Sequence, residues 1–294
     1  MKKRVLLYIL TGFWSLLVVT CSNAPREEVV KTYPDGMKQE VERYLGRGND
    51  RQLLAKLGYY QDGSVSFEEN YSSAGGIETY RSWWQNGNPK IIRQYEADSL
   101  ISETSYDSDG VRHLVADEVN RIIADLAAYQ GDPATPQDTV VMETSVGTIK
   151  LVLFTDVAPR HCDNFKRLAN SGYYDNTTFH RVAPGFVIQG GDILSRDATR
   201  RNDGTGGPGF TVPAEFNPRP HRKGTLAMAR GTDPNSAGSQ FYIALSRLSR
   251  LDNNYTVFGE VVEGLEVVDG IATTITDSGE NPIYPQRILR VRVD

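Results

Sequence analysis

The stretch from Phe179 to Asp192, FHRVAPGFVIQGGD, places one arginine and one glutamine among aromatic and small apolar residues. Two later stretches, GTLAMARGTDPNSAGSQFYIAL (224–245) and LDNNYTVFGEVVEG (251–264), add residues of the same kinds. The apolar and aromatic members of this set are Phe179, Phe186, Phe241, Tyr242, Leu251 and Tyr255, and the hydrogen-bonding members are Arg181, Gln189 and Gln240. Such a mixture predicts a groove for an uncharged, partly apolar ligand such as a peptide.

Other chemistries find little support in the residues. The four histidines stand at no metal-ligand spacing with another His or Cys, and the sequence has no Cys-x-x-Cys, so we expect no metal site. The stretch NDGTGGPG (202–209) lacks the Lys-Ser/Thr of a phosphate loop and predicts a turn. Ser239 lacks the Gly-x-Ser-x-Gly frame of a nucleophile elbow, which argues against covalent hydrolysis.

The elements that must position these residues form a C-terminal domain over residues 139–294. Alternating apolar residues predict a hairpin in TVVMETSVGTIKLVLF (139–154) and a last strand in ILRVRV (288–293). Helical patterns follow Pro159 and cover EGLEVVDGIA (263–272). Many short strands with two helices predict a closed β-barrel. Cys162 falls on the apolar face of the first helix, so we expect a core residue rather than a nucleophile.

A repeat occupies residues 32–112. The fragments YPDG (33–36), YQDG (60–63), WWQNG (83–87) and YDSDG (106–110) each join an aromatic residue to Asp-Gly or Asn-Gly, which is a strong hairpin signal. They predict an array of β-hairpins that resembles MORN-type repeats and that serves as a spacer or a surface for a protein partner. Residues 113–138 predict a connector, whose helical part has Val115, Val119, Ile122, Leu126 and Tyr129 on one face. A linker with two prolines then ends the helix and marks the boundary before the C-terminal domain.

The N-terminus is typical of an exported protein. Residues 1–21 combine Lys2, Lys3 and Arg4 with an apolar run that ends at Val18-Val19-Thr20-Cys21. This pattern resembles a bacterial lipoprotein signal, which implies lipidation of Cys21 and attachment to a membrane of the bacterial cell envelope, with the chain facing the periplasm or the exterior. An uncut membrane anchor and a plain signal peptide are the alternatives. Residues 22–31 are polar and predict a flexible tether. The net charge of −5 argues against a nucleic-acid partner.

The stretches 179–192, 224–245 and 251–264 closely resemble the cyclophilin family of peptidyl-prolyl cis/trans isomerases, and the likeness runs from residue 139 to the C-terminus. The resemblance implies an eight-stranded antiparallel barrel capped by two helices, within a chain that is mainly β. It implies Arg181 as the catalytic arginine and Gln189 as the glutamine that binds the substrate backbone. The substrate-binding positions that it implies are Phe186, Val187, Ala229, Arg230, Gln240, Tyr242, Leu251 and Tyr255.

Four positions depart from the family pattern. Arg250 stands where cyclosporin-sensitive members carry Trp, so we expect weak or no cyclosporin binding. Tyr255 stands where many members carry His, and Val187 replaces the common Met. Tyr242 also stands where the family usually has Phe. Because the Arg181–Gln189 pair is intact, we expect activity to survive.

We therefore expect an isomerase without cofactor that assists protein folding in the cell envelope and acts on proline-containing polypeptides. One alternative is a binding module or chaperone that uses the same fold to hold proline-containing segments, with incidental turnover. Another alternative makes the β-repeats the functional half of the chain and the isomerase an accessory.

Overall fold

The structure is a computed structural model that describes residues 24–294, so the predicted signal segment and Cys21 lie outside the described residues. The chain divides into two compact units, and the division falls between Glu103 and Thr104. Both units are mainly β, as the sequence predicts. The helices within residues 24–294 are all too short or too polar to span a bilayer.

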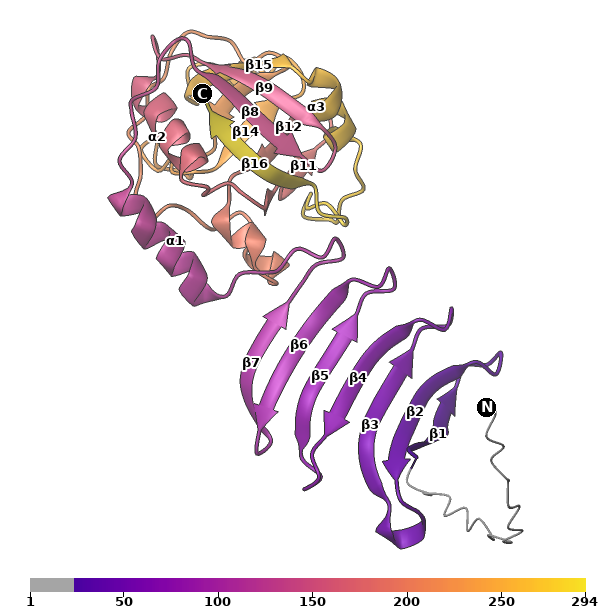
Figure 1. Cartoon of the computed structure of the whole chain (residues 1–294). Coiled ribbons are helices and arrows are strands. Elements are labelled where there is room, and N and C mark those ends of the chain that lie inside the picture. The colour runs from indigo at the N-terminus through magenta and orange to yellow at the C-terminus, as the bar shows by residue number, and fades with distance from the viewer. Residues whose placement is uncertain (1–23) are drawn as a thin grey trace, which may run out of the picture. The chain divides into compact units, whose positions relative to one another are not determined.

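The first unit is a single seven-stranded sheet in which each strand pairs with its neighbour in the sequence (Figure 1). A short 3-10 turn, η1 (Gly48–Asp50), interrupts the connection between the second and third strands. The strands are β1 (Arg26–Thr32), β2 (Lys38–Leu45), β3 (Gln52–Tyr59), β4 (Val65–Tyr71), β5 (Ile77–Trp83), β6 (Pro89–Glu96) and β7 (Ser99–Ser105).

The repeated fragments form turns at one end of this sheet, between β1 and β2, β3 and β4, and β5 and β6. The first two of these turns are each tied to the next repeat by a tyrosine hydroxyl. The hydroxyl of Tyr33 donates to the carbonyl of Tyr59 at 2.9 Å, and that of Tyr60 donates to Trp83 at 2.8 Å. The closing glycine of the second turn, Gly63, has a φ of 84°, which favours glycine. The turns thus stack the repeats, whereas the resemblance to MORN-type repeats stays a prediction.

The tether predicted for residues 22–31 is replaced in the structure by β1, which begins at Arg26. The polar residues that suggested a tether form cross-strand ion pairs instead. Glu27 bonds Arg43 on β2 at 2.9 Å, and Glu28 bonds Arg51 at 2.8 Å. Charged residues along an exposed edge strand are a common protection against edge-to-edge pairing, and their composition is easily mistaken for a linker.

The second unit contains the predicted β-barrel, built from one antiparallel sheet (Figure 1). The sheet order is β10-β16-β8-β9-β15-β13-β14-β12-β11. Helix α2 (Pro159–Asn170) packs against β15 and β16, and α3 (Leu265–Ala272) packs against β9, β11 and β12 on the other side of the barrel. The strands are β8 (Thr139–Thr144), β9 (Thr148–Leu153), β10 (Thr177–Thr178), β11 (Arg181–Ala183), β12 (Val187–Gly190), β13 (Thr225–Met228), β14 (Phe241–Ala244), β15 (Val257–Glu263) and β16 (Arg287–Val293).

One short segment closes the barrel. Thr177 pairs with β16 at one end of the sheet order, and four residues later Arg181 pairs with β12 at the other end. Because β10 and β11 are two parts of this segment, the nine strands correspond to the eight that the family resemblance implies. The seam is tight: a Cβ atom on Gly190 would lie 3.2 Å from Ile288 and 3.3 Å from Phe179. Glycine at this position lets the two edges approach each other.

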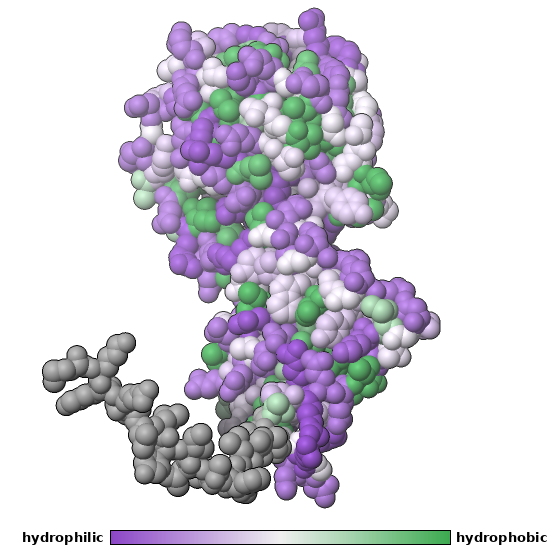
Figure 2. All heavy atoms as spheres, turned by 45° about the vertical axis from the view of Figure 1, so that its right-hand side comes forward, coloured by the Kyte–Doolittle hydropathy of each residue, from purple (hydrophilic) through white to green (hydrophobic). Residues whose placement is uncertain are grey.

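Cys162 lies in the barrel core with no exposed surface, as predicted. Burial raises the pKa of its thiol to about 12, so the thiolate is not populated near neutral pH. The thiol is a packing group beneath α2. The surface differs from this interior: on the face shown in Figure 2, hydrophobic residues are scattered among hydrophilic ones in both units.

The predicted connector helix is α1 (Ala116–Ala128), and it belongs to the second unit rather than to a linker. Leu114, Val119 and Leu126 are buried in the same hydrophobic cluster as the barrel interior. Val115, which the sequence places on the apolar face, is 52% exposed. The sequence pattern identifies an amphipathic helix but not the surface that it packs against. The second compact unit therefore does not begin at the boundary expected after residue 138, because it begins at Thr104 and includes α1.

Replacing Leu126 with Ala tests this assignment. Because Leu126 is 2% exposed within the barrel cluster, we expect the substitution to lower the free energy of unfolding by about 2–4 kcal/mol. Urea unfolding followed by far-ultraviolet circular dichroism of the full chain measures the change. Asp125→Ala on the exposed side of α1 is the matched control and should change the value by less than about 0.5 kcal/mol. Equal stability of the two variants would show that α1 is a linker.

Candidate active site

The polar residues predicted to do chemistry lie side by side in one row across the sheet. Arg181 on β11 is opposite Gln189 on β12, and Gln189 is opposite Tyr242 on β14. Tyr242 is in turn opposite Ala227 on β13. Directly opposite residues of antiparallel strands project from the same face, so the register brings the guanidinium, the amide and the phenol ring together.

This face carries a cavity of about 190 Å³ on the outer side of the barrel. Nine of the ten residues predicted for the site line it: Arg181, Phe186, Val187, Gln189, Ala229, Arg230, Tyr242, Leu251 and Tyr255. Phe186 reaches the cavity from the turn that ends β11, and Leu251 from the 3-10 turn η4 (Ser249–Leu251). Its apolar residues form a small cluster separate from the barrel core. We refer to this cavity as the main pocket.

Phe179 and Phe241 do not line the main pocket, although the sequence analysis grouped them with it. Both are fully buried in the barrel core, where their rings meet edge to face with centroids 6.4 Å apart. Phe241 directly precedes Tyr242 on β14, and successive residues of a strand point to opposite faces. The correct set therefore excludes these two aromatic residues because of strand alternation.

Gln240 also lies outside the main pocket and lines a neighbouring cavity of about 510 Å³. Its amide nitrogen donates to the carbonyls of Gly204 and Gly206 at 2.9 Å, and its amide oxygen accepts from Gln189 at 3.0 Å. Gln240 therefore connects the glycine-rich loop to the glutamine of the main pocket. Its side-chain donors are occupied by protein, so it orients Gln189 rather than facing the main pocket itself.

Arg181 has a partner that the sequence analysis missed. Its Nε donates to the carboxylate of Glu280 at 2.7 Å, which leaves the terminal guanidinium nitrogens available on the pocket side. The backbone carbonyl of Glu280 also accepts from the Val182 amide at 2.7 Å, so the loop is fixed to β11 by two contacts. Glu280 has a φ of 64°, an uncommon conformation for a non-glycine residue. The stretch around Glu280 gives only a turn signal, 99 residues away in the sequence, and no motif points to it.

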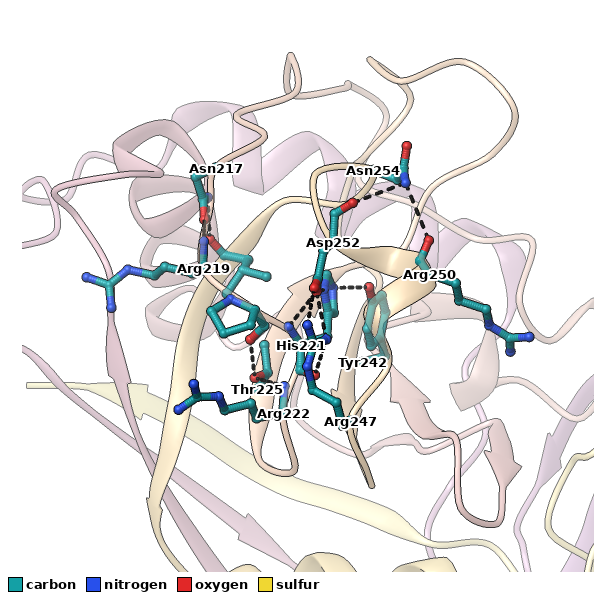
Figure 3. A network of polar contacts seen from close by, with 12 residues as sticks. Asn217, Arg219, His221, Arg222, Thr225, Tyr242, Arg247, Arg250, Asp252 and Asn254 are labelled. Atoms are coloured by element: carbon teal, nitrogen blue, oxygen red, sulfur yellow. Dashed lines mark hydrogen bonds and ion pairs between the residues drawn. The ribbon is translucent and has the colours of Figure 1, made fainter.

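A polar network lies behind the wall of the main pocket (Figure 3). The Tyr242 hydroxyl donates to Nε2 of the fully buried His221 at 2.9 Å. The Nδ1 of His221 lies 3.1 Å from the carboxylate of Asp252, which also pairs with Arg247. Because Asp252 directly follows Leu251, the network fixes the 3-10 turn that carries this apolar wall residue.

The protonation states of this network agree with its geometry. Burial lowers the pKa of His221, so the ring is neutral near neutral pH. The hydrogen bond from Arg247 is the largest of the effects that hold the pKa of Asp252 well below its usual range, so the carboxylate is ionised. A neutral ring that donates from Nδ1 to Asp252 has Nε2 free to accept from Tyr242. Within residues 24–294 no group of three His, Cys, Asp or Glu side chains is placed to hold a metal ion.

Replacing Tyr242 with Phe tests the network. The substitution leaves Nε2 of the buried His221 without its donor, so we expect the free energy of unfolding to fall by about 1–2 kcal/mol. Urea unfolding measures the change. Tyr255→Phe is the control, since Tyr255 contacts Tyr242 and Arg230 through its ring. A Tyr242→Phe chain as stable as the native chain would contradict the proposed network.

Comparisons with known proteins agree with this geometry. The family described as cyclophilin type peptidyl-prolyl cis-trans isomerase matches residues 139–293. A probable peptidyl-prolyl cis-trans isomerase of Brucella suis is 36% identical over 173 residues, which cover 57% of this chain and 88% of the relative. The peptidyl-prolyl cis-trans isomerase ppi1 of Schizosaccharomyces pombe is 40% identical over 158 residues, which cover 51% of this chain and 96% of the relative.

A solved structure is similar over the same region. The cyclophilin type peptidyl-prolyl cis-trans isomerase of Cryptosporidium parvum is 34% identical, with a TM-score of 0.50, and the match covers 53% of this chain and 97% of that one. The family match spans the whole barrel and includes every residue of the main pocket. The chain therefore belongs to the cyclophilin-type peptidyl-prolyl cis-trans isomerases.

Proposed function

We propose that the second unit accelerates the cis/trans exchange of Xaa-Pro bonds without covalent chemistry, through the Arg181 guanidinium at the rim of the main pocket. The observation that carries the proposal is the combination of an apolar seat with two hydrogen-bonding groups in one cross-strand row. Phe186, Leu251 and Tyr242 supply a seat for a proline ring. Arg181 and Gln189 lie at its edge, within reach of an amide that enters the pocket.

The reaction requires the loss of amide resonance. An Xaa-Pro bond rotates over a barrier of about 20 kcal/mol, because the twisted state loses the partial double bond. As the bond twists, the proline nitrogen becomes pyramidal and regains a lone pair. A donor aimed at that nitrogen forms a hydrogen bond mainly in the transition state, and such a bond lowers the barrier rather than merely binding the substrate.

The surroundings of Arg181 suit this task. Its contact with Glu280 through Nε holds the guanidinium in one orientation, so the terminal nitrogens are presented without a search among rotamers. Gln189, which Gln240 orients, binds the substrate backbone on one side of the amide. The backbone near Arg230 fixes the same side while the other side rotates. We assign the catalytic roles to Arg181 and Gln189 on this basis.

Replacing Arg181 with Ala tests the mechanism. We expect kcat/KM for the exchange of an Ala-Pro peptide to fall by about 100-fold or more, because a charged donor to the transition state is lost. Exchange spectroscopy by NMR with the full chain measures the rate. Arg181→Lys keeps the charge but not the planar fork, and we expect an intermediate rate.

Arg222→Ala is the control for the loss of a positive charge, since Arg222 is exposed on the same unit and lies outside the main pocket. It should keep the native rate. Equal rates for the native chain and Arg181→Ala would remove the assigned mechanism. Tight binding of the peptide without acceleration by the native chain would favour the alternative, a binding module that holds proline-containing segments.

We further propose that the chain acts in the bacterial cell envelope, held to a membrane by lipid on Cys21. The support is the sequence of residues 1–21, whose basic start and apolar run end at this cysteine. Proline isomerisation is slow enough to limit folding, so an isomerase fixed at the membrane would serve proteins that fold after export. Cyclosporin binding, expected to be weak because of Arg250, and a protein partner of the seven-stranded sheet stay predictions.

Labelling tests the anchor. When the full chain is produced in bacteria that are fed radioactive palmitate, we expect the label in the native chain and its loss in Cys21→Ala. Cys162→Ala should keep the label, because Cys162 is fully buried within the barrel. Label that persists in Cys21→Ala would contradict lipidation at this residue.

A further inference from the structure

Beyond Arg181, Arg230 lines the main pocket and Arg250 lies beside it, and each guanidinium lies over an aromatic residue of the pocket. The guanidinium carbon of Arg250 is 4.7 Å from the centre of the Phe186 ring. That of Arg230 is 4.6 Å from the centre of the Tyr255 ring. A contact of this kind attracts the cation to the ring face without neutralising its charge.

Carboxylates do not neutralise these two charges within the described part of the chain. The guanidinium of Arg230 donates to the backbone carbonyls of Asn254, Gly231 and Thr232, which carry no net charge. The side chain of Arg250 extends away from Asp252, whose carboxylate pairs with Arg247 (Figure 3). Both cations therefore remain uncompensated beside the pocket.

The other arginines near the pocket behave differently. Arg181 is paired with Glu280, and Arg247 is paired with Asp252. The chain as a whole has a net charge of −5, so the positive charge at the pocket is a local feature and not a consequence of composition. Uncompensated charge at a binding site favours ligands of opposite sign and disfavours ligands of the same sign.

We infer that the preferred substrates are proline segments with acidic side chains next to the proline, recognised by Arg230 and Arg250. This inference rests on the proposed isomerase function and specifies its substrate class. A carboxylate that approaches Arg250 can accept two parallel hydrogen bonds from its guanidinium. Arg230, whose N–H groups mostly donate to backbone carbonyls, contributes through its positive charge. A basic neighbour of the proline is repelled by the same two groups.

Three peptides that differ beside one proline provide the test: Glu-Pro-Glu, Ala-Pro-Ala and Lys-Pro-Lys within one neutral host sequence. Exchange by NMR with the full chain at low salt gives kcat/KM for each. We expect kcat/KM to be highest for the Glu peptide, intermediate for the Ala peptide and lowest for the Lys peptide. The highest and lowest values should differ about tenfold, mainly because KM differs. The ratio should shrink at high salt, since these charges are close to solvent.

Variants assign the preference to the two arginines. In the double variant Arg230→Ala/Arg250→Ala, we expect the ratio of kcat/KM for the Glu peptide to that for the Lys peptide to fall to within about twofold of unity. This ratio does not depend on any loss of overall rate. Arg230→Lys/Arg250→Lys should restore part of it, because the charges return without the planar fork. Arg222→Ala, the matched loss of one exposed charge, should keep the native ratio.

The outcomes separate the two levels of the proposal. Equal kcat/KM for the three peptides, or a preference that survives in the double Ala variant, overturns the acidic substrate class and leaves the isomerase function standing. The absence of acceleration for all three peptides overturns the isomerase function and, with it, this inference.

Discussion

The pairing of one short segment with both ends of a sheet is the constraint on which the second unit depends. Between Thr177 and Arg181 the chain leaves β16 and joins β12, and the sheet becomes a barrel. The same crossing places Arg181 opposite Gln189, so closure of the barrel also assembles the row of Arg181, Gln189 and Tyr242. Gly190 has no room for a side chain at this seam. A change that loosens the seam would therefore disturb stability and chemistry together.

The arginines at the site differ in whether a carboxylate pairs with them. Arg181 is held by Glu280, and the network behind the pocket is closed by the pair of Asp252 with Arg247. Arg230 and Arg250 lie over aromatic rings, as Arg181 also does over Phe186, but no carboxylate within residues 24–294 pairs with them. An ion pair and a contact with an aromatic ring can both orient a cation, but only the ion pair neutralises its charge. This difference underlies the separate roles proposed above, with Arg181 acting on the proline amide and Arg230 and Arg250 on the side chains beside it.

The sequence predicts the barrel, its two capping helices and most of the main pocket, because these follow from ordered motifs within one family. What it could not predict depends on partners distant in the chain. Glu280 contacts Arg181 from a loop that contains no recognisable motif. The sequence of α1 predicts an apolar face but does not indicate which surface that face covers. Phe241 was misplaced because composition groups it with its neighbour, whereas strand alternation separates them. The edge strand β1 has the composition of a linker, and only the three-dimensional structure shows that it pairs with β2.

The pairing of the first and last strands has a consequence for synthesis. β8 begins the barrel at Thr139 and pairs with β16, which ends at Val293, one residue before the C-terminus. The barrel therefore cannot close until β16 has left the ribosome, whereas each hairpin of the first unit is complete as soon as its second strand emerges. Helix α1 is made before the barrel residues that share its hydrophobic cluster. The strands of the first unit can thus pair while the barrel residues made before β16 still expose part of their apolar surface.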